Sequence, residues 1–364
     1  MRVQDRYYWL DLIRFLSAFL VLVAHFRGSF FVEYGMLPEA DKGIGAFLFF
    51  SITRLGHEAV LVFFVLSGFL VGGKTIERIR NNTFDIRSYS IDRGVRIMLP
   101  LFSATLLVIM DNMIRGISND WLIIIGNLLS LQGVIVPPSV EPLWSLSYEV
   151  WFYIFIGCIG VIFMISDKKT KIYPPPIILL ILGCMVFTKL NPIYLIVWLV
   201  GSFAYIIPLP RKNTWKMLLW LSLVLCSCVL LQIKSESRSL EALPWKYYLP
   251  NKQCCELLFT FAFVGFMRQI VQFVPKTRVS ALLNRWGTTL AAFSYTLYLT
   301  HMQVRNLLLY IGFPKSQSFN VQTISLLFVE LIIALSFAYG IYWCFEKRTK
   351  IVKDKLKMRF IKSN

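Results

Sequence analysis

The sequence predicts an all-α, polytopic membrane protein with about ten transmembrane helices and with both termini in the cytoplasm. Of the 364 residues, 57% are hydrophobic and 16% are charged, whereas an ordinary soluble domain carries about 25% charged residues. The mean hydropathy of +0.62 reflects apolar stretches that recur along the whole chain and are long enough to cross a bilayer. No connecting segment is long enough to form a separate soluble domain.

The positions of the basic residues predict the orientation in the membrane. About 26 of the 38 Lys and Arg residues fall on the side that holds the N-terminus, and about 9 fall on the other side. Cytoplasmic loops are enriched in Lys and Arg, so this side is predicted to be cytoplasmic. The same bias explains the net charge of +18 without a nucleic-acid partner. The predicted spans are residues 8–26, 57–73, 94–112, 143–165, 175–190, 192–208, 215–233, 255–274, 288–311 and 321–345.

The first span begins like a secretory signal peptide, with basic residues before an apolar run. Charged residues interrupt that run and no small-residue cleavage site follows, so we expect residues 8–26 to remain as an uncleaved span. The arginine-rich residues 74–93 are predicted to form a cytoplasmic loop. Residues 121–136 are apolar but of marginal length for a span, and we interpret them as re-entrant or interfacial.

The C-terminal tail, residues 347–364, alternates basic and apolar residues. This pattern is typical of an amphipathic segment on the anionic inner leaflet of a membrane. We therefore predict two parts, a transmembrane domain over residues 1–346 and a basic cytoplasmic tail.

Two ionisable residues of the first span, Arg14 and His25, lie eleven positions apart. A helix turns 100° per residue, so eleven residues return to within about 20° of the same face, about 16 Å further along the axis. Ionisable groups inside a membrane helix are costly and usually serve function. The structural alternative is an intrahelical ion pair between Arg14 and Asp11, which precedes it by three residues.

Three histidines, at positions 25, 57 and 301, are predicted to lie in the outer half of the membrane. The structural alternative for any one of them is a hydrogen-bonded interfacial histidine, which explains His25 about as well as a functional role does and is the favoured interpretation of His57. Glu149 lies near the outer start of the fourth span, where a carboxylate must be paired or protonated. It can orient a histidine, as a carboxylate does in acyl-transfer triads, or it can pair with a buried hydroxyl or arginine.

Further polar residues form two local patterns. Arg93 and Arg96 share one helix face at the inner start of the third span and suit bidentate phosphate contacts, although cytoplasmic flanks carry such residues for topology alone. In the ninth span, residues at spacings of four, three and four form one polar stripe, which predicts that this face looks at protein or a wet cavity. They are Ser294, Tyr298, His301 and Arg305.

Five segments, in chain order, resemble the motifs of the integral membrane acyltransferase family called acyltransferase three. Each motif alone is weak, but five in family order, from residue 9 to about residue 302, are specific. They are Arg-x10-His in the first span (Arg14, His25), FFVLSGFL with Ser67, Arg-x-x-Arg before Ile-x-x-Pro (Arg93, Arg96), WSLSYEVWFY with Trp144 and Glu149, and SYTLYLTH with Tyr298 and His301.

The resemblance implies acyl-CoA, usually acetyl-CoA, as the donor and a glycan or lipid-linked glycan as the acceptor. Bacterial members O-acylate O-antigen, capsule, exopolysaccharide and peptidoglycan, so a multi-pass protein of the bacterial cytoplasmic membrane is expected. Some longer relatives carry a fused hydrolase-like domain, and this chain is expected to act without one. We expect His25 and Glu149 to be catalytic, Arg14, Arg93 and Arg96 to bind the donor, and Asp11, Ser67, Trp144, Tyr298 and His301 to line or support the acceptor path.

The expected reaction uses no metal and no bound cofactor, since the seven cysteines show neither metal-ligand spacing nor a disulfide framework. The donor's phosphates would bind to the basic inner mouth, and the thioester would reach toward His25. His25 would act as general base or carry the acyl group, and Glu149 would set its tautomer.

Other functions remain open from the residues alone. A transporter or flippase of lipid-linked glycan also explains polar residues inside the membrane, although the halves typical of many transporters are not visible. A receptor or assembly scaffold with purely structural histidines is a further alternative. Within the enzyme class, a succinyl or longer acyl donor and a non-glycan acceptor are compatible with the sequence.

Overall fold

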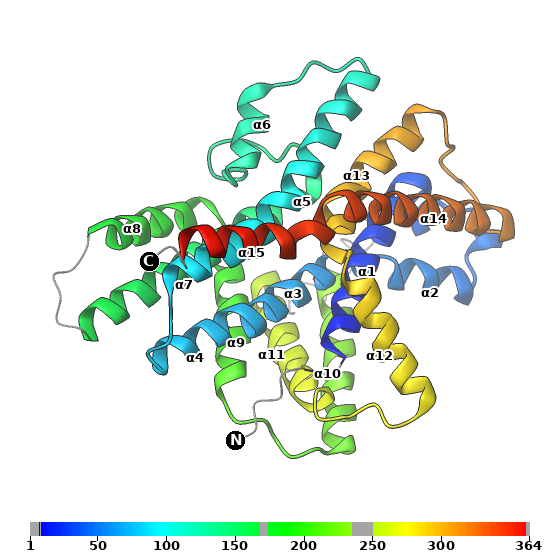
Figure 1. Ribbon diagram of the computed structural model, residues 1–364. Coiled ribbons are helices and arrows are strands. Elements are labelled where there is room, and N and C mark those ends of the chain that lie inside the picture. Colours follow the sequence, from blue (N-terminus) through cyan, green and yellow to red (C-terminus); the bar gives the residue numbers. More distant parts are fainter. Residues whose placement is uncertain (1–6, 8, 168–173, 235–249, 362–364) are drawn as a thin grey trace. The chain divides into compact units, whose positions relative to one another are not determined.

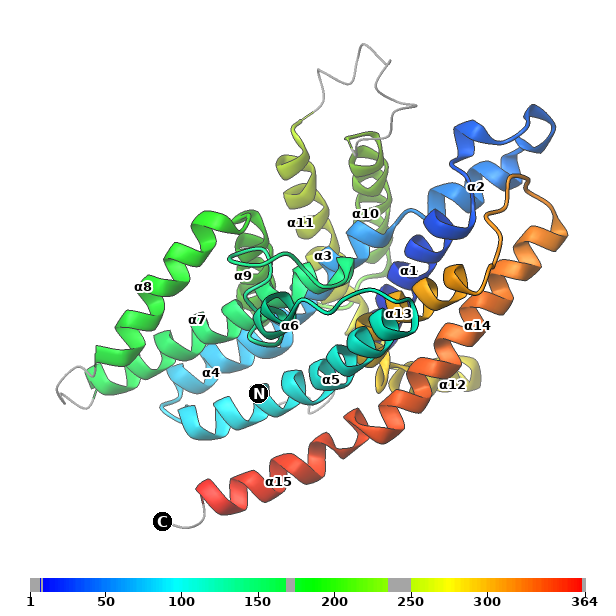
Figure 2. The same ribbon diagram turned by 90° about the horizontal axis from the view of Figure 1, so that it is seen from above.

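The computed structural model describes residues 7, 9–167, 174–234 and 250–361, and these form helices joined by short connections (Figures 1 and 2). The described residues contain no β-strand and only two isolated β-bridges. The all-α prediction is therefore confirmed. Five helical runs among these residues are long and apolar enough to cross a membrane: Ile44–Arg80, Ile86–Ile114, Glu141–Met164, Thr214–Lys234 and Val321–Phe360. The other predicted spans and the orientation of the termini stay predictions.

The chain packs as two compact units, each built from separate stretches of sequence. The first unit comprises residues 1–66, 207–294 and 313–331, and the second comprises residues 67–206, 295–312 and 332–364. The second unit runs across residue 346, and the predicted division of the chain there stays a prediction.

The first unit is organised around α1 (Leu10–Phe30) and the pair α10 and α11. Figure 2 shows α10 and α11 packed side by side, and Figure 1 shows α1 beside α12. Gly287 of α12 makes the second contact close, because a side chain there would meet the backbone of Leu12 at 2.9 Å. The helices of this unit are α2 (Ile44–Ile52), α3 (Gly56–Ser67), α10 (Thr214–Lys234), α11 (Lys252–Ile270), α12 (Arg278–Ala291) and the first part of α14 (Val321–Cys344), with 3₁₀ turns at Tyr34–Met36 and Glu39–Asp41.

In the second unit a glycine-rich π-helix, η3 (Gly68–Gly73), continues α3 and packs chiefly against α9 (Ile193–Ile206). A Cβ atom added to Gly68 would lie 2.0 Å from the carbonyl oxygen of Trp198 on α9, so only glycine allows this approach. The other helices of the unit are α4 (Lys74–Arg80), α5 (Ile86–Ile114), α6 (Trp121–Leu128), α7 (Trp144–Asp167), α8 (Pro174–Lys189), α9 (Ile193–Ile206), α13 (Ser294–Tyr310, its first residue in the first unit), the end of α14 and α15 (Thr349–Phe360), with 3₁₀ turns at Glu141–Leu143 and Glu346–Arg348.

The predicted loop over residues 74–93 is wrong in its length. Helix α4 continues the preceding helix to Arg80, and α5 begins at Ile86, so residues 81–85 make the connection. The Asp85 carboxylate accepts hydrogen bonds from the backbone N–H groups of Arg87 and Ser88, at 3.1 and 3.0 Å, and so starts α5 as an N-cap. The apolar pattern marks the part of a helix that can lie in a bilayer, whereas the helix itself extends beyond it.

Residues 121–136 contain an eight-residue helix, α6, which spans about 12 Å and is too short to cross a membrane core of about 30 Å. Asn127 is one of the polar residues that interrupt this apolar segment. Its side chain donates to the carbonyls of Ile123 and Pro137 and accepts from the N–H of Ser139. Gln132, another of these polar residues, donates to the carbonyl of Leu143, which directly precedes α7.

The predicted ninth span is divided in the structure. Helix α12 ends at Ala291 and α13 begins at Ser294. The C-terminal tail forms the predicted helix, α15, which lies along α5 in Figure 2. Lys353 and Lys357 of α15 both contact the carboxylate of Asp92 on α5, at 3.3 and 2.8 Å.

Candidate active site

Helix α1 carries Arg14 and His25 in the first unit. Its start is fixed by Trp9, whose backbone N–H donates to Asn284 Oδ1 at 3.1 Å and whose indole N–H donates to the Phe273 carbonyl at 2.6 Å. Arg14 Nη1 lies 3.3 Å from Asp11 Oδ1, so the intrahelical ion pair is present. Both side chains are partly exposed, at 23% and 31%. Because α1 is continuous from Leu10 to Phe30, Arg14 and His25 lie on one face, about 16 Å apart along the axis.

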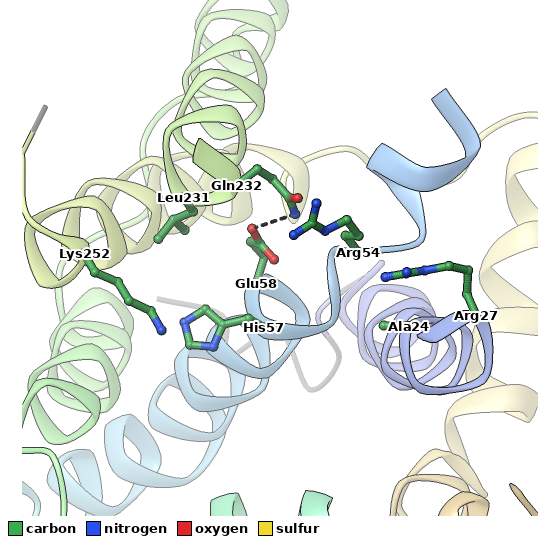
Figure 3. Close-up of a pocket in the computed structure, with 8 residues that line it drawn as sticks. All are labelled: Ala24, Arg27, Arg54, His57, Glu58, Leu231, Gln232 and Lys252. Atoms are coloured by element: carbon green, nitrogen blue, oxygen red, sulfur yellow. Dashed lines mark hydrogen bonds between the residues drawn. The ribbon is translucent and has the colours of Figure 1, made fainter. Parts of the chain in front are cut away.

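A polar cavity of about 280 Å³ lies in the first unit beside the end of α1 (Figure 3). Its walls come from α1, the turn between α2 and α3, the start of α3, and the facing ends of α10 and α11. We call it the His57 pocket. Its lining residues are Ala24, Arg27, Arg54, His57, Glu58, Leu231, Gln232 and Lys252.

His57 is paired with a buried carboxylate from a distant part of the chain. Its Nε2 lies 2.8 Å from Oε1 of Glu256 on α11, and Glu256 is 1% exposed. Next to it, Glu58 accepts a hydrogen bond from Gln232 Nε2 at 3.2 Å (Figure 3). The start of α3 also approaches α1 closely at the pocket, because a Cβ at Gly56 would lie 2.8 Å from the Cβ of Ala24. The structural interpretation of His57 as a hydrogen-bonded histidine thus agrees with its contacts, but it sits in a charged pocket.

In the second unit, Glu149 lies in a chain of hydrogen bonds that joins three helices. The hydroxyl of Tyr153, one turn further along α7, donates to Glu149 Oε1 at 2.5 Å. The same hydroxyl lies 3.1 Å from Oγ of Ser67, and the indole N–H of Trp198 donates to that Oγ at 3.2 Å. The expected pairing of Glu149 with a buried hydroxyl is therefore present. Glu149 belongs to the second unit and His25 to the first, so a role of Glu149 toward His25 stays a prediction.

Arg93 lies within α5, two turns after its start, and its guanidinium is 5.8 Å from the ring centre of Tyr153. Arg93 also lines an apolar cavity of about 480 Å³ between α5, α7 and α8. Arg96, one turn further along α5, is exposed. The structure thus places Arg93 beside Tyr153, within the hydrogen-bonded chain that contains Glu149.

Three residues of the predicted polar stripe on α13, Ser294, Tyr298 and His301, are buried and hydrogen-bonded. The Tyr298 hydroxyl lies 2.6 Å from Ser145 Oγ at the start of α7 and donates to the Pro142 carbonyl at 2.9 Å. His301 is 1% exposed, and its Nδ1 lies 3.0 Å from the Leu297 carbonyl. These contacts agree with the prediction that this face of the helix looks at protein, and they give Tyr298 a role in holding α13 against α7.

Trp144 is the first residue of α7, and its ring packs edge-on against Tyr148 and at a tilt against Tyr194, at 5.7 and 5.4 Å between centroids. It is therefore part of an aromatic cluster at the junction of α7 and α9. Among the described residues, no group of three or more His, Cys, Asp or Glu side chains is arranged to hold a metal ion.

Sequence reasoning missed four residues that the structure places at these sites: Tyr153, Trp198, Glu58 and Glu256. Glu58 and Glu256 carried a usable signal, since each is a carboxylate next to or inside a predicted span. Tyr153 ends the motif WSLSYEVWFY and so lay within a segment already singled out, whereas Trp198 gave no signal, because aromatic residues are common in apolar helices.

The apolar helices and the buried polar side chains define a helical membrane protein. The chain belongs to acyltransferase family three, whose sequence model, described as an acyltransferase domain, matches residues 7–343. No curated protein and no solved structure matches the chain at a significant level. The protein is therefore a membrane acyltransferase of the general kind that the family represents.

Proposed function

We propose that the protein transfers an acyl group, specifically acetyl, from cytoplasmic acyl-CoA to a hydroxyl of a cell-surface glycan such as O-antigen, capsule or exopolysaccharide. The location that this requires is the cytoplasmic membrane of a bacterium. The observation that carries the proposal is the pair Arg14 and His25 on one face of a continuous helix in a chain of this family. Their separation of about 16 Å by helix rise is comparable to the reach of an extended pantetheine arm.

The proposed donor site uses arginine. Arg14, Arg93 and Arg96 would bind the phosphates of the nucleotide, because guanidinium groups form bidentate hydrogen bonds with phosphate. The cavity next to Arg93 supports this assignment, since its apolar walls offer room for an arm attached to a phosphate group. Ligand pockets commonly measure about 300–1,000 Å³, and the cavity of about 480 Å³ falls within that range.

The proposed chemistry is acyl transfer through general base catalysis. His25 would take the proton of the acceptor hydroxyl while the oxygen attacks the thioester carbonyl. The C–S bond then breaks, an ester C–O bond forms, and the proton passes from His25 to the departing CoA thiolate. The buried polar residues of α13 and the start of α7, including Tyr298, would support the acceptor path.

The proposal is tested with purified protein in lipid vesicles, supplied with radiolabelled acetyl-CoA and a lipid-linked glycan extract. We expect saturable acetyl-CoA binding and transfer of label to the glycan. A transporter or flippase would move the glycan without binding acetyl-CoA, and that outcome would refute the proposal. Succinyl-CoA and longer acyl-CoA compounds, used in parallel, identify the acyl group.

A further inference from the structure

The His57 pocket gathers cationic side chains from three separate elements. Arg27 comes from the end of α1, Arg54 from the turn before α3, and Lys252 from the start of α11, and all three reach the cavity (Figure 3). His57 adds an imidazole whose ring is oriented by Glu256. Arg27 Nη1 also pairs with Glu33 Oε1 at 3.1 Å, and Glu58 lines the same cavity, so Arg54 and Lys252 supply the positive charge that favours an anionic ligand.

Two buried polar atoms at the same cavity also need partners. Arg27 and Glu58 are each 5% exposed and line the pocket. Within the described residues, Arg27 Nε and Glu58 Oε2 form no hydrogen bond. A buried polar atom without a partner is costly, so such atoms usually meet a ligand or ordered water. Glu58 Oε2 can accept a hydrogen bond from a hydroxyl, while Arg27 Nε can donate one.

The combination specifies the chemistry of the ligand. Arg54 and Lys252 outnumber Glu58, the one carboxylate in the pocket lining, which suits an oxyanion, and a buried carboxylate acceptor suits a donor such as a hydroxyl. The cavity of about 280 Å³ is at the small end of ligand pockets, which suits one sugar-sized group. In the predicted topology, every lining residue lies at the outer end of its span.

We propose that the His57 pocket binds the acyl acceptor through a sugar residue that carries a phosphate or a carboxylate. Arg54 and Lys252 hold the oxyanion, and Glu58 accepts a hydrogen bond from a hydroxyl of the same sugar. Ala24, which lines the pocket, directly precedes His25 on α1. The identification of this sugar as the acceptor rests on the proposed function, whereas the binding of a charged sugar does not.

The binding test uses purified full-length protein in detergent and three probes: glucose 1-phosphate, glucuronate and the uncharged methyl glucoside. We expect at least one charged sugar to bind at least tenfold more tightly than methyl glucoside. Binding of glucose 1-phosphate alone identifies a sugar phosphate as the source of the oxyanion, and binding of glucuronate alone identifies a uronate. If neither charged sugar binds better than methyl glucoside, the proposal is wrong.

Substitutions of lining residues test whether the charged sugar binds in the His57 pocket. Arg54→Gln and Lys252→Met should each weaken binding of the charged sugar about tenfold, because each removes a charged partner. The matched control is Lys42→Met, which removes a cation of the same unit that pairs with Glu39 outside the pocket. Equal affinity of wild type and an Arg54→Gln/Lys252→Met double variant with unchanged size-exclusion elution would overturn the proposal.

Acyl-transfer assays separate this proposal from the proposed function. If both are correct, the pocket variants raise the KM for glycan about tenfold and leave the KM for acetyl-CoA unchanged. If charged sugars bind but no label reaches any glycan, the proposed function fails and the pocket assignment stands. If label is transferred with an unchanged KM for glycan in the double variant, the pocket assignment fails and the function stands.

Discussion

The hydroxyl of Tyr153 lies 2.5 Å from the carboxylate of Glu149, one helical turn away on α7. The same hydroxyl contacts Ser67, so it connects two motifs that are more than 80 residues apart in the sequence. These are FFVLSGFL, which ends in the π-helix η3, and WSLSYEVWFY, which opens α7. Tyr153 belongs to the second motif, so its hydroxyl joins residues of both motifs in one hydrogen-bonded chain.

We predict that Tyr153→Phe destabilises the protein by about 1–3 kcal/mol, because it leaves a half-buried carboxylate and Ser67 without their shared partner. The melting temperature in detergent measures this effect. Tyr310→Phe is the matched control, since Tyr310 is 56% exposed at the end of α13. Equal melting temperatures for Tyr153→Phe and wild type would show that the hydrogen bonds contribute nothing.

We predict that Gly68→Ala costs about 1–3 kcal/mol or more of stability, because the new methyl group would overlap the backbone of Trp198. Melting temperature and size-exclusion elution report the loss of packing between η3 and α9. Gly340→Ala on α14 is the control, since no atom lies within 4 Å of a Cβ placed there. A well-folded Gly68→Ala variant as stable as Gly340→Ala would contradict the described packing.

Arg14 either binds the donor or serves only as the ion-pair partner of Asp11, and the variants Arg14→Lys and Asp11→Asn distinguish these two roles. If Arg14 binds the donor, Arg14→Lys should raise the KM for acetyl-CoA at least tenfold, because lysine cannot form bidentate contacts, while Asp11→Asn should leave it within about threefold. If Arg14 serves only as the partner of Asp11, both variants should keep the wild-type KM for acetyl-CoA. Steady-state kinetics with varied acetyl-CoA distinguishes these results.

The tail helix α15 should detach more readily from α5 when Asp92 is replaced by Asn. Lys353 and Lys357 both pair with Asp92, and losing a partly buried pair worth about 1 kcal/mol changes an opening equilibrium roughly fivefold. The rate of limited trypsin cleavage within residues 349–360 measures this opening. Asp354→Asn, an exposed change on α15 itself, should leave the rate unchanged. Equal cleavage rates in Asp92→Asn and Asp354→Asn would show that the ion pairs of Asp92 do not hold α15 against α5.

Hydropathy predicted several helices closely. The predicted spans 143–165, 215–233 and 321–345 correspond to α7, α10 and the residues Val321–Cys344 of α14. These helices are apolar along their whole length, so the pattern and the helix coincide. The agreement fails where a helix continues into polar residues, as α4 and α5 do, and where an apolar stretch contains a break, as it does between Ala291 and Ser294.

The contacts of the sites could be predicted only in part. The pairing of Arg14 with Asp11 follows from their spacing on one helix. The pairing of His57 with Glu256 joins residues 199 positions apart, and it exists because α11 packs near the start of α3. A single sequence gives the period of each helix but not its neighbours, so this carboxylate partner could not be assigned to His57.

We propose that His25 is the general base for acyl transfer to a surface glycan. The role of His25 is tested by mass spectrometry of surface polysaccharide from cells that express wild-type protein, the His25→Ala variant or no protein. We predict acylated polysaccharide only with the wild-type protein, while His25→Ala reaches the membrane in equal amount. Polysaccharide that is acylated to the same extent with His25→Ala as with wild type, and less without the protein, would contradict the assignment of His25. Polysaccharide that is identical in all three strains would contradict the proposed function itself.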